Sequence, residues 1–297
     1  MKELDRKGKI LLGGTCALVA LVVVLAAIAL ALRGGEDPAP EDTGPSVPAD
    51  ELLVEDLYEG QRLIPKFDVE KNELDPELFQ EGEDGFLHYG EALLGVDVAE
   101  YQGTIDWGQV KEAGIDFAIL RLGWRGMTEG GLNLDATYQQ NIEGAAGAGM
   151  PVGVYFFSQA VSEEEAREEA AFVLEALGGR ELQYPVVFDW EQPFPSESLP
   201  AEDLRAYDMT GEQVSRFALA FCQEIEKGGY TPCVYTNKTM AYGFFDLELL
   251  KDYPLWYAEY QPAPSLYYGF DLWQYTASGS VPGIDGDVDL NLCFGSF

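Results

Sequence analysis

The sequence predicts an α/β fold: a modified (β/α) barrel of about eight strands, with fewer helices in its C-terminal part, preceded by one transmembrane helix. Three observations lead to this prediction. From Leu93 onward, apolar strand patterns alternate with amphipathic helical patterns, which is typical of a parallel sheet with helical crossovers. After Thr236 short strand patterns continue while helical patterns become rare. Residues 10–32 carry no charge and are strongly apolar.

The N-terminal segment is predicted to be a membrane anchor. Residues 1–9 form a basic leader that we expect in the cytoplasm, and residues 10–32 are long enough to cross a bilayer as a helix. The remainder of the chain would then lie outside the cell membrane. A cleaved signal peptide is the alternative, because small residues occur at 26–31, and it would make the protein secreted. The length of the apolar run favours the uncleaved anchor.

Two acidic segments follow the apolar run. Residues 33–50 consist largely of Pro, Glu, Asp and Gly, a composition that predicts a disordered tether. Residues 51–92 remain acidic but contain apolar groups, as in "RLIPKFDV" and "GFLHYG". We therefore expect an ordered acidic extension that packs on the main domain, which spans residues 93–297.

The main domain repeats the order strand, helix, strand. Helical patterns at 106–114, 136–149, 162–179 and 210–229 each end at glycine, where a left-handed C-cap is expected. No GxGxxG follows the first strand, which disfavours a dinucleotide-binding fold. The eight expected strands lie within 93–103, 116–124, 150–159, 184–191, 231–237, 254–260, 270–275 and 287–292.

Composition excludes several classes of function. The net charge of −34 and the pI of about 4.1 argue against a nucleic-acid partner, because phosphate contacts need clustered Lys and Arg. His88 is the only histidine, which disfavours a Ser-His-Asp triad and excludes multi-histidine metal sites. Cys222, Cys233 and Cys293 follow no metal-binding spacing and are interpreted as buried free thiols. We expect neither a cofactor nor a metal.

The stretch "YPVVFDWEQ" places two carboxylates at the end of an apolar strand. Residues two apart on a strand point to the same side, so Asp189 and Glu191 would face one space and Trp190 would turn away. Burying carboxylates is unfavourable unless they are paired or serve a function. An acidic turn after a core strand is the alternative explanation.

Further polar and aromatic residues occur at the other expected strand ends, where the chemistry of a (β/α) barrel is located. Carboxylates with aromatic residues, and without metal or histidine, are typical of glycoside hydrolysis: one acid donates a proton and another stabilises positive charge. Two neighbouring acids also raise at least one pKa, which keeps the donor protonated. These residues are Asp97, Arg121, Trp124, Tyr155, Phe157, Tyr235, Asn237, Trp256, Tyr260, Trp273, Gln274, Tyr275 and Asp289.

Three separated motifs resemble glycoside hydrolase family 25, the lysozyme-type N-acetylmuramidases. They are "GVDVAEYQGTIDW" at 95–107, "VVFDWE" at 186–191 and "LWQYTASGSVPGIDGDVDLN" at 272–291. The resemblance covers about 93–297 and implies a modified barrel with eight strands and about five helices. It also implies hydrolysis of the β-1,4 bond between N-acetylmuramic acid and N-acetylglucosamine in peptidoglycan. One departure is Ala99, where the family often has Ser; that position is not a catalytic acid.

The resemblance implies roles for single residues. The catalytic carboxylates are Asp97, Asp189 and Glu191, with Glu191 as general acid. Asp189 would orient the 2-acetamido group or stabilise an oxocarbenium-like centre, with Asp97 assisting. The two-residue spacing leaves inverting, retaining and substrate-assisted routes open. Asp289 would position the substrate, and the remaining expected substrate-binding residues are Tyr155, Tyr235, Trp256, Tyr260, Trp273 and Gln274.

Two other functions compete with this interpretation. A non-catalytic barrel that binds the cell wall would require loss of a catalytic carboxylate, and all three are present. A glycosidase for another N-acetylated polysaccharide such as chitin shares the D-x-E pair, but the "DVAEYQG" and "WQY" motifs argue against it. The expected partners are peptidoglycan and, through residues 10–32, the cytoplasmic membrane. The protein is expected to act as a monomer.

Overall fold

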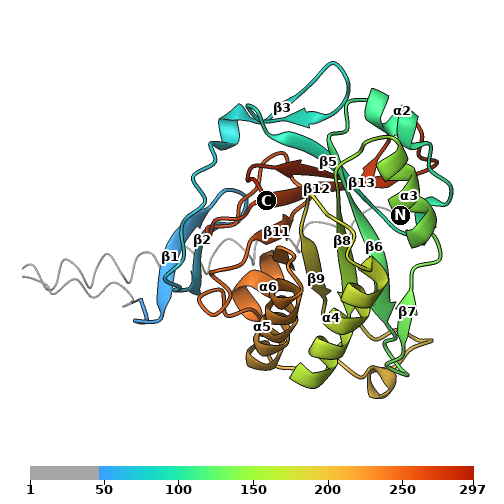
Figure 1. Ribbon diagram of the computed structural model, residues 1–297. Helices are drawn as coiled ribbons and strands as arrows, with labels where there is room; N and C mark the ends of the chain where they lie inside the picture. The colour runs from blue at the N-terminus through green and yellow to red at the C-terminus, as the bar shows by residue number, and fades with distance from the viewer. Residues whose placement is uncertain (1–46) are drawn as a thin grey trace, which may run out of the picture. The chain divides into compact units, whose positions relative to one another are not determined.

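Eight strands close into a barrel in the computed structural model, which describes residues 47–297 (Figure 1). Their order is β5-β13-β12-β11-β10-β9-β8-β6, and pairing of β5 with β6 closes the ring. The eight-strand prediction is thus confirmed. The strands are β5 (Leu93–Val98), β6 (Phe117–Arg125), β8 (Val152–Ser158), β9 (Val186–Trp190), β10 (Pro232–Asn237), β11 (Leu255–Ala258), β12 (Leu272–Gly279) and β13 (Val288–Cys293). A short strand, β7 (Leu132–Leu134), pairs with the end of β6.

One strand differs from the expected all-parallel sheet. β13 runs antiparallel to both of its neighbours, β12 and β5, whereas the other barrel strands pair in parallel. The connection between β12 and β13 contains no helix, so the chain returns directly instead of crossing over. As a result, the first residues of β13, not its last, lie at the carboxyl ends of the parallel strands.

The described residues contain five α-helices, all before β11. Four confirm the helical patterns of the sequence: α2 (Trp107–Glu112), α3 (Tyr138–Gly147), α4 (Glu163–Leu177) and α5 (Gly211–Lys227). Gly178 caps α4 in the left-handed conformation, as expected, and its N–H bonds the Leu174 carbonyl. The fifth, α6 (Lys238–Gly243), is too short to leave a periodic pattern; the Asn237 side chain caps it by accepting the Met240 N–H at 3.0 Å. Short 3₁₀ turns lie at Pro76–Leu78, Glu100–Gln102 and Ala201–Asp203.

Alternation along the strands fills the barrel interior with apolar side chains. Val187 of β9 points inward, where it packs with Phe117 and Trp256, while Val186 and Phe188 face the outer layer. The interior cluster consists of Phe117, Ile119, Val187, Cys233, Trp256, Leu272 and Cys293. Cys222, Cys233 and Cys293 are buried and unbridged, which confirms their interpretation as free thiols.

The segment before the barrel is ordered and packs against it. β1 (Glu51–Asp56) and β2 (Gly60–Pro65) form an antiparallel hairpin, drawn in blue in Figure 1, and β3 (Gln80–Glu81) pairs with β4 (Leu87–His88). Ile64 and Phe86 are buried in the outer core. The Tyr268 hydroxyl bonds the carbonyl of Pro65, and Phe79 packs edge-on against Trp273 at 5.1 Å. His88 is exposed beside Asp84.

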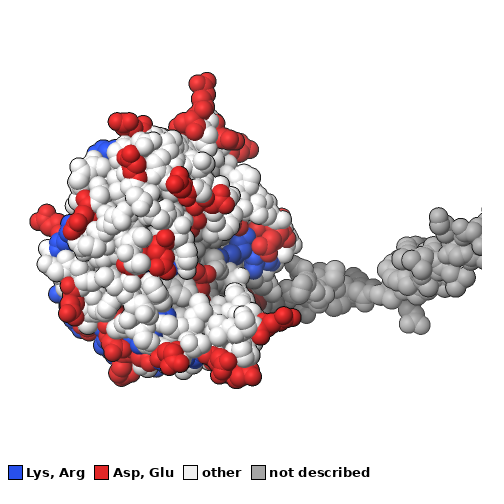
Figure 2. Space-filling view, turned by 90° about the vertical axis from the view of Figure 1, so that its right-hand side faces the viewer, with Lys and Arg blue, Asp and Glu red and all other residues white. Residues whose placement is uncertain are grey.

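The predicted membrane helix at 10–32 and most of the predicted tether lie outside the described residues. Between Val47 and Phe297 no helix is both long and apolar enough to span a bilayer. The face shown in Figure 2 carries many Asp and Glu side chains, while Lys and Arg form no continuous stripe on it.

Candidate active site

A hollow of about 240 Å³ lies at the carboxyl ends of the parallel barrel strands. Side chains from all eight strands or from the loops that follow them line it, as expected for a barrel mouth. The lining residues are Asp97, Arg121, Tyr155, Phe157, Asp189, Glu191, Tyr235, Trp256, Tyr260, Gln274 and Asp289. The four carboxylates singled out from the sequence therefore meet in one cavity.

The period of two along β9 brings Asp189 and Glu191 to this hollow. Asp189 follows Val187 on the inward side of the strand and is 7% exposed, and Glu191 comes next on the same side. Trp190 points away, fully buried, with its indole N–H donated to the Ala160 carbonyl at 3.2 Å. The predicted orientation of Trp190 is confirmed. The side-chain amide of Gln159 donates to the backbone carbonyl of Glu191 at 3.0 Å and fixes the end of the strand.

Asp97 and Asp289 face each other across β5 and β13, where they are register partners. Gln274 joins them: its amide nitrogen donates to Asp97 Oδ2 at 2.8 Å and to Asp289 Oδ2 at 3.2 Å. Asn291 also donates to Asp97 Oδ2 at 2.8 Å. Asp97 is thus held rigidly by two amide donors, one from β12 and one from β13.

Two tyrosines hold Gln274 in this orientation. The hydroxyls of Tyr235 and Tyr260 donate to Gln274 Oε1 at 3.1 and 2.9 Å, which leaves the amide nitrogen for the carboxylates. Trp256 lies beneath, edge-on to Tyr235 at 5.0 Å, and donates its indole N–H to Asn291 at 2.8 Å. The floor of the hollow is therefore a continuous polar network on an aromatic base.

Burial and mutual repulsion favour the protonated forms of these carboxyls. Burial and the charge of Asp289 raise the pKa of Asp97 well above its usual range. Burial, then Glu191 and Asp97, do the same for the pKa of Asp189, against the opposing effect of Arg121. Burial raises the pKa of Glu191 as well. Asp189 Oδ1 is buried and has no hydrogen-bond partner among the described residues, so it can accept a hydrogen bond from a ligand.

Arg121 supplies the one basic side chain in the wall of the hollow. Its guanidinium bonds Asp135 at 2.7 Å and Glu100 at 3.1 Å, and the rings of Tyr101 and Trp124 each lie 4.9 Å from it. These contacts hold the cation in place beside Asp189.

The structure does not bring Trp273 to the hollow, so its assignment as a substrate-binding residue is wrong. Trp273 is next to Gln274 on β12, so alternation turns it outward, where it is fully buried and bonds the Glu259 carbonyl at 2.9 Å. Sequence reasoning also missed Asn291. It lies two residues after Asp289, and the same alternation that links Asp189 to Glu191 could have identified it.

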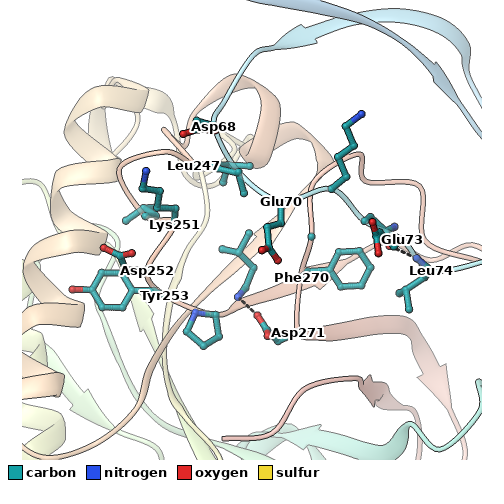
Figure 3. Close-up of a pocket in the computed structure, with 17 residues that line it drawn as sticks. Asp68, Glu70, Glu73, Leu74, Leu247, Lys251, Asp252, Tyr253, Phe270 and Asp271 are labelled. Carbon is teal, nitrogen blue, oxygen red and sulfur yellow. Dashed lines mark hydrogen bonds between the residues drawn. The ribbon is translucent and has the colours of Figure 1, made fainter.

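A larger hollow of about 970 Å³ lies at the opposite end of the barrel, between residues 68–74 and the starts of β11 and β12 (Figure 3). None of the residues assigned to the site from the sequence lines it. Asp271, its most buried carboxylate, is already bonded by the Leu255 N–H at 3.1 Å. The candidate site is therefore the smaller hollow at the mouth.

Comparison with known proteins identifies relatives of this barrel. The model of glycosyl hydrolases family 25 matches residues 96–284. The autolytic lysozyme of Clostridium acetobutylicum is 30% identical over 200 residues, which are 67% of this chain and 55% of that protein. Lysozyme M1 of Streptomyces globisporus is 30% identical over 218 residues, 69% of this chain and 68% of that protein. The chain thus spans about half the length of the Clostridium relative.

Solved structures share the fold. The autolysin LytC from Streptococcus pneumoniae, in complex with a synthetic peptidoglycan ligand, superposes with a TM-score of 0.60 at 22% identity, covering 84% of this chain and 57% of that one. A family 25 glycosyl hydrolase from Bacillus anthracis gives a TM-score of 0.57 at 24% identity, covering 70% and 93%. At these identities the likeness concerns the fold alone.

Proposed function

The chain belongs to glycosyl hydrolase family 25 and is a glycoside hydrolase, and from this premise we propose that it hydrolyses the β-1,4 bond between N-acetylmuramic acid and N-acetylglucosamine in peptidoglycan. The observation that carries the proposal is the convergence of Asp97, Asp189, Glu191 and Asp289 in one hollow with an aromatic base. Two relatives at 30% identity are named as lysozymes, which supports the same substrate class.

Glu191 acts as the general acid in this proposal. It stands at the edge of the hollow, less buried than Asp189, where it can reach the oxygen between two sugars. Its raised pKa keeps the proton available at higher pH than for a free glutamate, as a proton donor requires. Proton transfer to the leaving oxygen accompanies cleavage of the glycosidic bond. A water molecule then adds its hydroxyl group to the anomeric carbon, and its proton restores the acid.

Asp189 orients the 2-acetamido group or stabilises the positive charge at the anomeric carbon. Its unpartnered Oδ1 is a free acceptor for an acetamido N–H, and its negative form lies where positive charge develops. Asp97, fixed by Gln274 and Asn291, assists Asp189 from the same hollow. Asp289 and Tyr260 present polar groups at the same mouth for the sugar hydroxyls.

The proposal includes a location outside the cytoplasmic membrane. The charge-free run at 10–32, preceded by Lys and Arg, supports an anchor with its N-terminus inside, and the polymer to be cut lies outside. We also propose that the protein acts as a monomer. Mass analysis of the cell-associated protein tests the anchor, because a mature N-terminus near Leu32 would mean a cleaved signal.

Product analysis tests the bond that is cut. The purified full chain is incubated with cell walls, and the released fragments are reduced and analysed by mass spectrometry. We expect new reducing ends on N-acetylmuramic acid. Reducing ends on N-acetylglucosamine would refute the proposed bond. Cleavage of chitin but not of cell walls would favour a different polymer, and binding without any release would favour a wall-binding barrel.

A further inference from the structure

The hairpin of β1 and β2 lies outside the segment that matches the family, residues 96–284, yet its turn reaches the loops around the site. The turn contains Asp56, whose Oδ1 accepts the N–H groups of Tyr58 and Glu59, both at 3.0 Å. Figure 1 shows the hairpin beside α6 and β11. The turn thus has a fixed shape and stands against two loops that follow barrel strands.

Lys238, the first residue of α6, joins the hairpin to the barrel. Its ammonium group bonds Asp56 at 2.9 Å and Glu59 at 3.2 Å in the turn, and Glu259 at 3.0 Å after β11. An ammonium group has three N–H donors, so these three carboxylates use all of them. Its side chain is 15% exposed and that of Asp56 only 1%. Lys238 therefore holds two segments together and has no donor left for a ligand.

The connection continues into the site through the loop after β11. The Glu259 carboxylate accepts the N–H and the hydroxyl of Ser265 at 2.6 and 2.7 Å, which folds this loop back on itself. The hydroxyl of Tyr58 bridges the backbone of Ala263, donating to its carbonyl at 2.9 Å and accepting from its N–H at 3.0 Å. Tyr260, which bonds Gln274 in the site, lies within this loop.

A third hollow, of about 270 Å³, lies beside the hollow of the candidate active site. Lys238 forms part of its wall. Glu191 lines both hollows. A general acid donates its proton to the oxygen that joins two sugars, so the sugar beyond that oxygen lies on the other side of the acid. The exposed ring of Phe194, 82% accessible, stands in the wall of this hollow as a face for a sugar ring.

We propose that the β1–β2 hairpin is a positioning element of the glycan cleft: through Lys238 and Tyr58 it fixes the wall of the hollow beside Glu191, where the sugar on the leaving side binds. The inference rests on the proposed muramidase function. Its physical basis is that, among the described residues, Lys238 alone links the turn to Glu259. Without its charge Asp56 and Glu59 keep Arg62 at 4.0 and 2.9 Å, but Glu259 loses its ion pair, and the hairpin and the loop after β11 are no longer held together by it.

The test compares Lys238→Met and Tyr58→Phe with wild type, using the full chain and a short soluble glycan strand prepared from peptidoglycan. For Lys238→Met we expect KM to rise about five- to ten-fold while kcat stays within about two-fold of wild type. This pattern results when the bound substrate and the transition state lose the same binding energy. Tyr58→Phe, at a side chain that is 40% exposed, should fold normally and raise KM by about two- to five-fold. Lys227→Met is the matched control, because within residues 47–297 Lys227 pairs only with Glu224 at the end of α5, and its side chain is 67% exposed.

The outcomes separate the two proposals. A raised KM in both variants, with the control unchanged, supports the hairpin role. A lower melting temperature with wild-type KM in the folded fraction of both variants refutes it, since the hairpin would then only stabilise the fold. If Lys238→Met does not fold, Tyr58→Phe decides alone, and an unchanged KM there refutes the role. Absence of wild-type cleavage refutes the proposed function itself.

Discussion

Replacing Glu191 by Gln removes one proton donor and changes little else at the site. Gln has the same shape, and the bond that fixes this end of β9 runs from Gln159 to the backbone carbonyl of Glu191, so it is kept. The neighbours of the side chain are also unchanged, because Trp190 packs on the other side of the strand. The substitution therefore tests proton donation with the geometry of the cleft preserved.

The expected loss of kcat in Glu191→Gln is that of general acid catalysis alone. General acid catalysis contributes about 10² to 10⁴ in rate, or about 3 to 5 kcal/mol of barrier. Because the half-buried donor stands beside Asp189 in the hollow, bulk water cannot easily replace it, and we expect kcat to fall by about 10³ or more. KM should stay within about three-fold, since the sugar contacts from the rest of the hollow remain.

The assay is release of soluble muropeptides from purified cell walls, together with kcat and KM on a soluble glycan strand. Glu175→Gln is the matched control, because Glu175 is exposed near the end of α4 and does not line the hollow. Both variants should give the circular dichroism spectrum and melting temperature of wild type. A folded Glu191→Gln protein that keeps kcat within a few-fold would refute the assignment of the proton donor.

Further predictions concern the second acid, pH and the extension. Asp189→Asn should also lower kcat by about 10² or more, and the double variant with Glu191→Gln should lose no more than the worse single one, as kinetics of all three will show. Burial raises the pKa of Glu169 from 4.5 to about 7, so the free energy of unfolding should fall as pH rises through this range. Urea titrations at several pH values should show a flatter dependence for Glu169→Gln, and an unchanged slope would contradict this. A chain that starts at Leu93 should melt well below one that starts at Val47 or fail to fold, because it uncovers apolar side chains of the barrel; equal melting temperatures would contradict the packing argument.

Local periodicity predicted much of this site. The apolar run before Asp189 identified a buried strand, and alternation then placed Glu191 with Asp189 and turned Trp190 away, as the structure has it. In "LWQY" the same alternation separates Trp273 from Gln274, because neighbours on a strand cannot share a face, and of the two only Gln274 reaches the hollow.

Other features depend on contacts between distant residues, which local patterns do not contain. The reversal of β13 follows from a connection without a helix and from pairing with β5, the first strand of the barrel. The approach of the hairpin to the site depends on Lys238, a single charged residue that nothing in its own neighbourhood distinguishes from a surface lysine. Only the assembled fold shows that three carboxylates surround it.

The closure of the barrel has a consequence for its biosynthesis. Leu93 at the start of β5 lies opposite Cys293 at the end of β13, so the ring is sealed by the strand that is synthesised last. Pairing over such a sequence separation is slow, because loop entropy must be overcome before the contacts form. A nascent chain on the ribosome therefore holds an open, unsealed sheet until β13 has emerged. The barrel can close only after that point in synthesis.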